Sequence, residues 1–133
     1  MTTSHGLLRL GPDRDPVPLE IAASYRARTR GLLGRDGMPG AALLLTPAGS
    51  VHTFRMRFAI DVAYLDRRLR VIALTTMPPG RLGLPRLRSR HVLEAEAGAM
   101  AAWGLQVGSQ LRIDGPAGPD PSQPPLGPAR PRR

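Results

Sequence analysis

Apolar and polar residues alternate over short segments of this chain, and glycine or proline residues separate the segments. Val17, Leu19 and Ile21 alternate in this way, which predicts a strand with one solvated face. Pro18 lacks a backbone donor and therefore indicates an edge position for this strand. Apolar runs between turn residues predict six more strands, at residues 41–46, 51–56, 60–65, 69–76, 92–97 and 110–113.

The chain has one strong hairpin signal and two short helical segments. The turn Pro47-Ala-Gly-Ser50 lies between residues 41–46 and 51–56, so these two strands are expected to pair as a hairpin. Ser24 can cap a helix over residues 25–33, and Gly34 can end it in the left-handed conformation. A second, alanine-rich helix is expected between Gly98 and Trp103.

Strands outnumber helices in this pattern and do not alternate with them regularly. The fold is therefore predicted to be mainly β, a compact antiparallel β-barrel or sandwich with one or two short flanking helices. A length of 133 residues suits one domain. We expect residues 1–16 to form a loose N-terminal arm, to which Leu8 and Leu10 could add an edge strand, and residues 17–114 to form the β-rich domain. Residues 115–133 are rich in Pro, Gly and Arg and are predicted to be a disordered tail.

Charge and composition restrict the possible functions. All 19 basic residues are arginine, and the net charge is +9, which favours non-specific attraction to polyanions. Aromatic residues make up only 4% and no RNA-binding or helix-turn-helix motif occurs, so only non-specific nucleic-acid binding is expected. The absence of cysteine excludes disulfides, thiolate metal sites and cysteine nucleophiles, and no other metal-binding or cofactor-binding motif is present.

The sequence also bears on location. No apolar run approaches the length of a membrane-spanning helix, and the N-terminal residues lack a signal-peptide core. We therefore expect a soluble, cytoplasmic protein, and the oligomeric state is not predicted.

The segment from Ser50 to Asp66 contains the most informative residues. His52, Phe54 and Met56 occupy alternate positions and are expected on one face of a strand. Asp61 interrupts an apolar run, and a buried carboxylate must be paired or hydrogen-bonded. We expect Arg30 or Arg35 to be its partner.

A series of short motifs occurs in order along residues 17–113: Arg30-Gly-Leu-Leu-Gly-Arg35, the apolar residues 41–45, His52-Thr-Phe-Arg-Met-Arg-Phe-Ala-Ile-Asp61, Val92-Leu-Glu94, and the glycines Gly98, Gly104 and Gly108. The series resembles the uncharacterised prokaryotic family catalogued as domain of unknown function 192. The resemblance implies a small, mostly β domain with no established biochemical activity, in a family whose members are often exported or membrane-anchored.

This chain departs from the family's usual pattern at three positions. Leu33 stands where the family usually has Met, and Ala59 stands where it favours Pro. Ser109 replaces an aspartate, so no site role is carried over to Ser109.

The motifs define a candidate ligand-binding site and a binding function. In the leading interpretation the protein is a binding or accessory module for a small anionic ligand or partner. Arginine side chains would hold a carboxylate or phosphate, Asp61 and Glu94 would orient the guanidinium groups, and Met56 with Phe54 would form an apolar wall. The candidate residues are Arg30, Arg35, His52, Met56, Asp61 and Glu94.

Two alternatives remain open, and no catalytic residue is assigned. Asp61 and Glu94 could be the acid and base of a hydrolase or sugar-processing enzyme, provided that both line one open cleft. Alternatively, the protein could be a basic interaction module for nucleic acid or an acidic partner. That module would use the C-terminal arginines and four surface arginines, Arg81, Arg86, Arg88 and Arg90.

Overall fold

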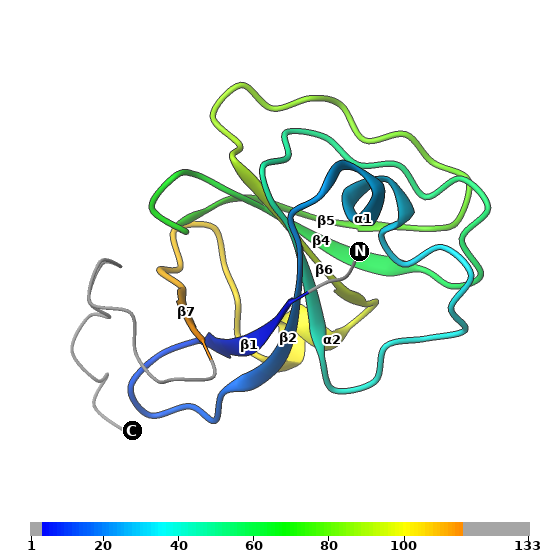
Figure 1. The fold of residues 1–133 in the computed structure, drawn as a ribbon. Coiled ribbons are helices and arrows are strands. Elements are labelled where there is room, and N and C mark those ends of the chain that lie inside the picture. Colours follow the sequence, from blue (N-terminus) through cyan, green and yellow to red (C-terminus); the bar gives the residue numbers. More distant parts are fainter. Residues whose placement is uncertain (1–3, 116–133) are drawn as a thin grey trace.

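A computed structural model describes residues 4–115 of the chain (Figure 1). The tail predicted at residues 115–133 lies outside the described residues except for Gly115. The described part has seven strands and two helices, in the order β1 (Ser4–Arg9), β2 (Val17–Ala22), α1 (Tyr25–Arg30), β3 (Ala42–Leu45), β4 (Ile60–Leu65), β5 (Val71–Met77), β6 (His91–Glu96), α2 (Ala99–Ala102) and β7 (Arg112–Asp114).

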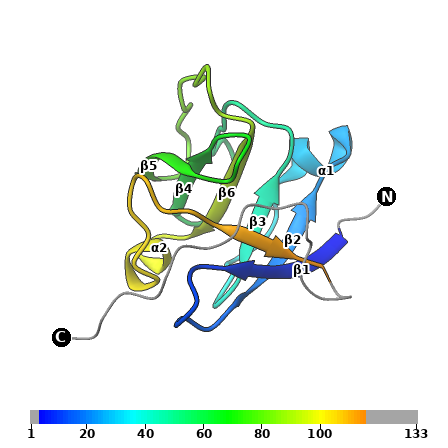
Figure 2. The same cartoon turned by 90° about the vertical axis from the view of Figure 1, so that its left-hand side faces the viewer.

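The seven strands form a single curled sheet, a half-barrel, in the order β5-β4-β6-β3-β2-β1-β7 (Figures 1 and 2). Every neighbouring pair is antiparallel except β2 and β3, which are parallel. The mainly β fold with two short helices is confirmed. The parallel pair requires a crossover connection, and residues 23–41 provide it, with α1 as its helix.

The N-terminal segment is part of the sheet, so the prediction of a loose arm at residues 1–16 is wrong for residues 4–9. Strand β1 pairs with β2 on one side and with β7 on the other, and Leu8 is fully buried in the core. Strand β2 is consequently an interior strand, and the edge position inferred from Pro18 is also wrong. Pro18 lies opposite Leu7 with its side chain exposed.

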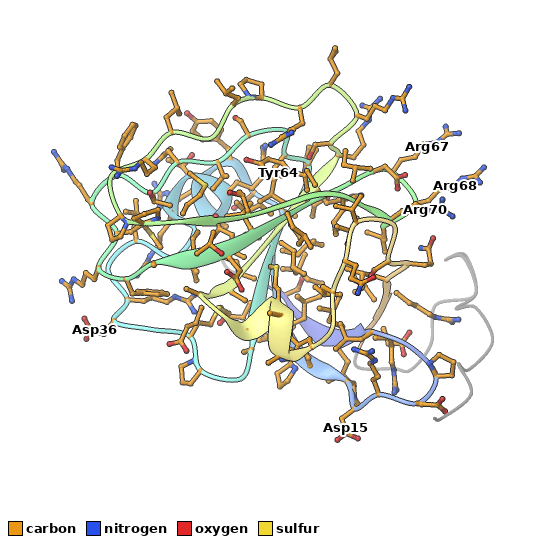
Figure 3. All side chains as sticks on the ribbon, turned by 180° about the vertical axis from the view of Figure 1, so that it is seen from behind. Asp15, Asp36, Tyr64, Arg67, Arg68 and Arg70 are labelled. Atoms are coloured by element: carbon orange, nitrogen blue, oxygen red, sulfur yellow. The ribbon has the colours of Figure 1, made fainter. Side chains whose placement is uncertain are left out.

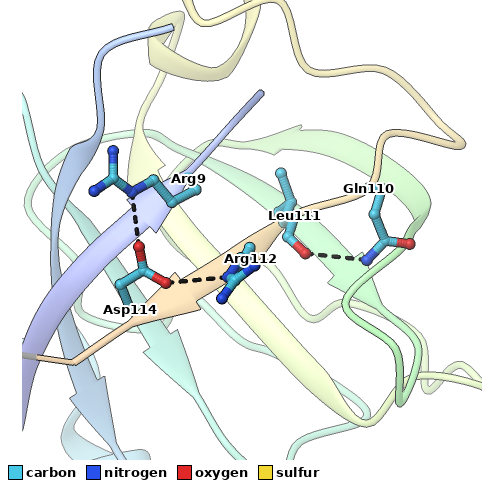
Figure 4. Close-up of polar contacts among 5 residues, drawn as sticks. All are labelled: Arg9, Gln110, Leu111, Arg112 and Asp114. Carbon is cyan, nitrogen blue, oxygen red and sulfur yellow. Dashed lines mark hydrogen bonds and ion pairs between the residues drawn. The ribbon is translucent and has the colours of Figure 1, made fainter. Parts of the chain in front are cut away.

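A buried carboxylate joins the two ends of the domain (Figure 4). Asp114 in β7 accepts hydrogen bonds from Nε of Arg9 at 2.8 Å and from Nε of Arg112 at 3.2 Å. Asp114 is only 3% exposed, so the ion pair with Arg9 holds β1 against β7 in a partly dry environment, while the ion pair with Arg112 lies within β7.

The predicted hairpin of residues 41–46 and 51–56 does not form. Strand β3 pairs with β2 and β6 instead, while residues 51–59 form a loop with a single β-bridge, between His52 and Leu82. Two local features interrupt the strand pattern: Arg55 has a φ of 63°, and the buried hydroxyl of Thr53 donates to the carbonyl of Pro78 at 2.6 Å. A loop held by a side chain in this way competes with the sheet ladder.

This loop separates the three residues that were expected on one strand face. The rings of His52 and Phe54 stack at 5.1 Å between centroids at the surface, whereas Met56 is buried in the core. The shared face predicted for His52, Phe54 and Met56 is therefore wrong.

The core has two parts, one on each face of the interior strand β4. All six residues of β4 are buried, as expected for a strand covered on both faces. Ile60, Val62 and Tyr64 pack in one cluster, which includes Leu32 and Met56. The alternate residues Ala63 and Leu65 pack in the other cluster, which includes Met100.

The helices are short and locally capped. As predicted, Ser24 caps α1, its Oγ accepting the backbone N–H of Ala27 at 3.1 Å. The helix ends at Gly31 rather than at Gly34, because Gly31 adopts φ 50° and ψ −127°, which a residue with a side chain rarely does. No helix within residues 4–115 has the length and apolarity needed to cross a bilayer.

Candidate functional site

The two carboxylates proposed as a catalytic pair, Asp61 and Glu94, lie on opposite faces of the sheet. Asp61 is directly opposite Ala95 in the β4–β6 ladder, while Glu94 is opposite Val62. Side chains of directly opposite residues share a face, and consecutive residues alternate between faces. Asp61 and Glu94 therefore line different hollows, so the shared cleft that the acid–base alternative requires is not formed.

Asp61 caps helix α2 from a distant strand. Its Oδ2 accepts the backbone N–H groups of Gly98 at 2.9 Å and Met100 at 3.1 Å, and its Oδ1 accepts the hydroxyl of Thr76 at 2.7 Å. Gly98, at the start of α2, has no side chain with which to cap that helix. The carboxylate of Asp61 supplies the missing acceptor, which explains its place in an apolar strand.

The prediction that Arg30 or Arg35 is the partner of Asp61 is wrong. Arg35 instead forms a two-pronged ion pair with Glu20, with distances of 2.8 and 2.9 Å. This pairing lowers the pKa of Glu20 and raises that of Arg35. Arg30 lies at the end of α1, on the other side of the sheet from Asp61, where it lines the cavity that contains Glu94.

Glu94 lies in a cavity of about 490 Å³. One wall is α1 with the turn that follows it, a second is the loop from Pro47 to His52, and a third is the residue pair Ser89 and Arg90 before β6. Glu94 is only 3% exposed, and its Oε1 has no hydrogen-bond partner. Burial raises the pKa of Glu94 to about 7.

Three arginines line the same cavity as this carboxyl, and none of them is hydrogen-bonded to its Oε1. Arg28, Arg30 and Arg90 all line the cavity. Arg28 donates through Nη1 to the carbonyl of Pro47 at 3.0 Å, while its Nε is buried and lacks a partner. Glu94 thus has an unpaired acceptor and Arg28 an unpaired donor, and both residues line the same cavity.

Gly31 permits the wall of the cavity to approach Glu94. A Cβ placed on Gly31 would lie 3.5 Å from Oε1 of Glu94. That distance is an ordinary van der Waals contact, so it is the positive φ of Gly31, with which the chain turns back over the carboxyl, that favours glycine here.

The sequence predicted part of this site. Arg30, His52, Met56 and Glu94 line the cavity as a group, whereas Arg35 and Asp61 do not. Sequence reasoning missed Arg28 and Gly31. Residues two apart on a helix do not share a face, so the spacing of Arg28 and Arg30 gave no signal for Arg28. The loop from Pro47 to His52, which completes the cavity, was predicted to be partly a strand.

The four surface arginines are exposed, as expected of a loop, but they do not form one cluster. Arg90 lines the Glu94 cavity, and Arg86 and Arg88 line a second groove on the surface. The guanidinium of Arg86 lies 4.9 Å from the ring centroid of Tyr64, which is buried within the body (Figure 3). Across residues 4–115, no cluster of three or more His, Cys, Asp or Glu residues is arranged to hold a metal ion.

Comparison with known proteins gives a consistent fold and no activity. The profile of the family catalogued as domain of unknown function 192, described as "Uncharacterized ACR, COG1430", matches residues 8–113. The UPF0127 protein PH1112 of Pyrococcus horikoshii is 29% identical over 98 residues, which cover 71% of this chain and 85% of that protein. The UPF0127 protein PYRAB11210 of Pyrococcus abyssi is 30% identical over 99 residues, covering 70% and 83%.

Two crystal structures have a similar fold. One is a protein of Sinorhizobium meliloti described as a candidate transcription regulator, with a TM-score of 0.73 and 18% identity, covering 85% of this chain and 96% of that one. The other is a protein of unknown function from Novosphingobium aromaticivorans, with a TM-score of 0.70 and 17% identity, covering 83% and 84%. At these identities the likeness concerns the fold alone.

Proposed function

Since the chain belongs to the family catalogued as domain of unknown function 192, whose own description is "uncharacterized", the function must be argued from the chemistry of the site, and we propose that the protein is a binding module for a small anionic molecule. The ligand occupies the cavity around Glu94. It carries a hydrogen-bond donor, such as a hydroxyl or amine, for Glu94 and an anionic group, a carboxylate or phosphate, for the arginines.

One observation carries this proposal: a buried acceptor of Glu94 and a buried donor of Arg28 both lack partners, and the two residues line the same cavity. Oε1 of Glu94 needs a donor, and Nε of Arg28 needs an acceptor. Buried polar groups are hydrogen-bonded in the large majority of cases, and an unmet carboxyl or guanidinium atom is costly. A single ligand with a donor and an anionic acceptor would satisfy both atoms.

The size and charge of the cavity support a small anion. A volume of about 490 Å³ is within the usual range for small-molecule sites. Arg28, Arg30 and Arg90 provide guanidinium groups suited to a carboxylate or phosphate, while Leu32 and Met56 provide apolar wall. Such a site binds and orients its ligand without requiring a catalytic step.

Thermal-shift measurements with small hydroxy acids, amino acids and sugar phosphates test the proposal. A ligand at about 100 times its Kd adds roughly 2.7 kcal/mol to the free energy of unfolding, which raises Tm by several degrees. The shift should be lost in Glu94→Gln and in Arg30→Gln. Arg35→Gln is the matched control, since Arg35 contacts Glu20 outside the cavity, and it should retain the shift. A panel without any shift, or equal shifts in all variants, would refute the proposal.

A further inference from the structure

Three leucines in the loop between β5 and β6 are exposed to solvent. Leu82, Leu84 and Leu87 are 66%, 75% and 97% exposed, respectively. Arg81, Arg86 and Arg88 lie beside or between these leucines in the loop. We call this the Leu/Arg surface and define it by six residues: Arg81, Leu82, Leu84, Arg86, Leu87 and Arg88.

The surface extends beyond the loop. Arg86, Leu87 and Arg88 line a shared groove of about 680 Å³ with Arg70 and Val107, and Val107 is itself 64% exposed. Arg70 lies in the turn between β4 and β5, where it projects from one end of the molecule with Arg67 and Arg68 (Figure 3). Apolar and cationic side chains from three separate segments therefore meet on one side of the domain.

The backbone of the loop is held in place while the leucines remain outside. The N–H of Gly83 donates to the carbonyl of Val51 at 2.7 Å, and the N–H of Arg86 donates to the carbonyl of Gly49 at 2.9 Å. The hydroxyl of Ser89 donates to the carbonyl of Ala48 at 3.0 Å. These bonds satisfy the loop's polar groups against the body and fix its position.

Gly83 explains why its neighbours face outward. A Cβ on Gly83 would lie 2.6 Å from the hydroxyl oxygen of Tyr64 and 2.9 Å from the carbonyl of Val51. The loop therefore lies directly on the body at Gly83, and Leu82 and Leu84 on either side of it are exposed. The exposed leucines lie in a loop whose backbone is fixed, and no element within residues 4–115 covers them.

The charge of the region indicates the chemistry of its partner. Residues 67–93 contain seven arginines and no acidic residue. A nucleic-acid site would combine arginines with aromatic rings that stack on bases, and leucines cannot stack in this way. Leucines interspersed with arginines match a bilayer surface that carries anionic headgroups, where apolar side chains enter the acyl boundary and arginines contact phosphates.

We propose that the Leu/Arg surface docks the protein peripherally onto an anionic lipid bilayer. Leu82, Leu84 and Leu87 insert at the level of the headgroups, and Arg81, Arg86 and Arg88 contact lipid phosphates. The Glu94 cavity takes no part in this contact, so the docking function is independent of ligand binding.

Vesicle co-sedimentation with the full chain tests the proposal. Vesicles of phosphatidylcholine alone are compared with vesicles of phosphatidylcholine and phosphatidylglycerol, at several salt concentrations. The wild type should bind the anionic vesicles and not the neutral ones. Leu82→Ser/Leu84→Ser/Leu87→Ser should weaken the binding by at least ~10-fold, because three insertions are lost. Arg81→Gln/Arg88→Gln should weaken it by roughly 5-fold per charge.

Matched controls distinguish this surface from the overall positive charge. Arg26→Gln/Arg57→Gln removes the same charge from residues outside the surface, and Tyr25→Ser removes an apolar side chain that is 78% exposed on α1. Both should bind nearly as the wild type does. Thermal melting of each variant verifies folding, and Leu87→Ser alone, at the most exposed of the three positions, provides a second test if the triple variant does not fold.

Three outcomes would overturn the proposal. Absence of binding to anionic vesicles is the first. Unchanged binding of the leucine variant is the second, since it would mean that charge alone attracts the protein. Equal losses in the control variants are the third, because they would show that no particular surface is used.

Discussion

The backbone N–H of Met100 donates to Oδ2 of Asp61 across 3.1 Å, which joins the first turn of α2 to strand β4. The same oxygen accepts the N–H of Gly98, so one strand carboxylate satisfies two donors at the helix start. Asp61→Ala should lower the free energy of unfolding by about 3 kcal/mol, because two backbone donors and the hydroxyl of Thr76 lose their acceptor. Urea denaturation measures this loss.

Asp61→Asn is the informative companion variant. An amide keeps one oxygen toward the helix start and can donate to Thr76, so the expected loss is about 1 kcal/mol. Had an arginine held Asp61 in a buried ion pair, removing the charge would cost ~3–5 kcal/mol. Equal losses for Asn and Ala would contradict the capping role.

Glu94 should make stability fall as pH rises from about 4.5 to about 7. Its pKa is about 7 in the folded protein against 4.5 for an ordinary glutamate. The unfolded chain therefore releases this proton first, and the folded state loses up to about 3 kcal/mol across that interval and no more above it. Denaturant unfolding at pH 5 and pH 8 measures the change.

Glu94→Gln removes this proton release and keeps the shape of the side chain. The variant should gain stability relative to the wild type at pH 8 and much less at pH 5. Parallel pH profiles for the two proteins would show that Glu94 does not titrate as its burial requires. In the proposed complex, a ligand that donates to Glu94 should reduce the difference between them.

Alanine variants of two glycines with positive φ distinguish the effect of backbone strain from an effect on the cavity. Gly31 has φ 50° and Gly34 has φ 80°, so alanine at either position should cost roughly 1–2 kcal/mol. A Cβ on Gly31 would lie against Glu94, whereas a Cβ on Gly34 would meet nothing within 4 Å. Gly31→Ala should therefore weaken ligand binding and Gly34→Ala should not. The melting temperatures and ligand-induced shifts of both variants provide the comparison, and equal effects on binding would argue against the position assigned to the ligand.

Nucleic-acid binding should be weak and independent of sequence. The net charge is +9, but few aromatic residues are available to stack on bases. Fluorescence anisotropy with labelled oligonucleotides should show affinity falling by at least ~100-fold between about 50 and 200 mM salt. A sequence preference that persists at the higher salt concentration would be inconsistent with this expectation.

The sequence predicted what local patterns determine. The run from Ile60 to Leu65 is apolar apart from Asp61 and is followed by the polar residues Asp66 and Arg67, and strand β4 has the predicted limits. Ser24 has a capping side chain at the start of a helical segment, and it caps α1. Asp61 was expected to be buried and hydrogen-bonded because of its place in an apolar strand, and both expectations are correct.

Long-range pairing determined the rest. The partner of Asp61 is the start of α2, which is remote in sequence and has no motif of its own for recruiting a carboxylate. The register of β4 against β6 places Asp61 and Glu94 on opposite faces, and a shift of one residue would have reversed that result. Leu8 also became part of the core because β7 returns to pair with β1, a contact between the two ends of the domain.

The parallel pairing of β2 with β3 separates the residues that build the sheet from several that line the Glu94 cavity. The crossover of residues 23–41 contributes Arg28, Arg30 and Gly31 to the cavity, but no strand of the sheet. Its length and polar residues can therefore change without altering any strand register, provided that Leu32 and Met38 continue to fill the core. If the proposed binding function holds, a different helix grafted at the crossover would change the ligand preference while the half-barrel stays the same.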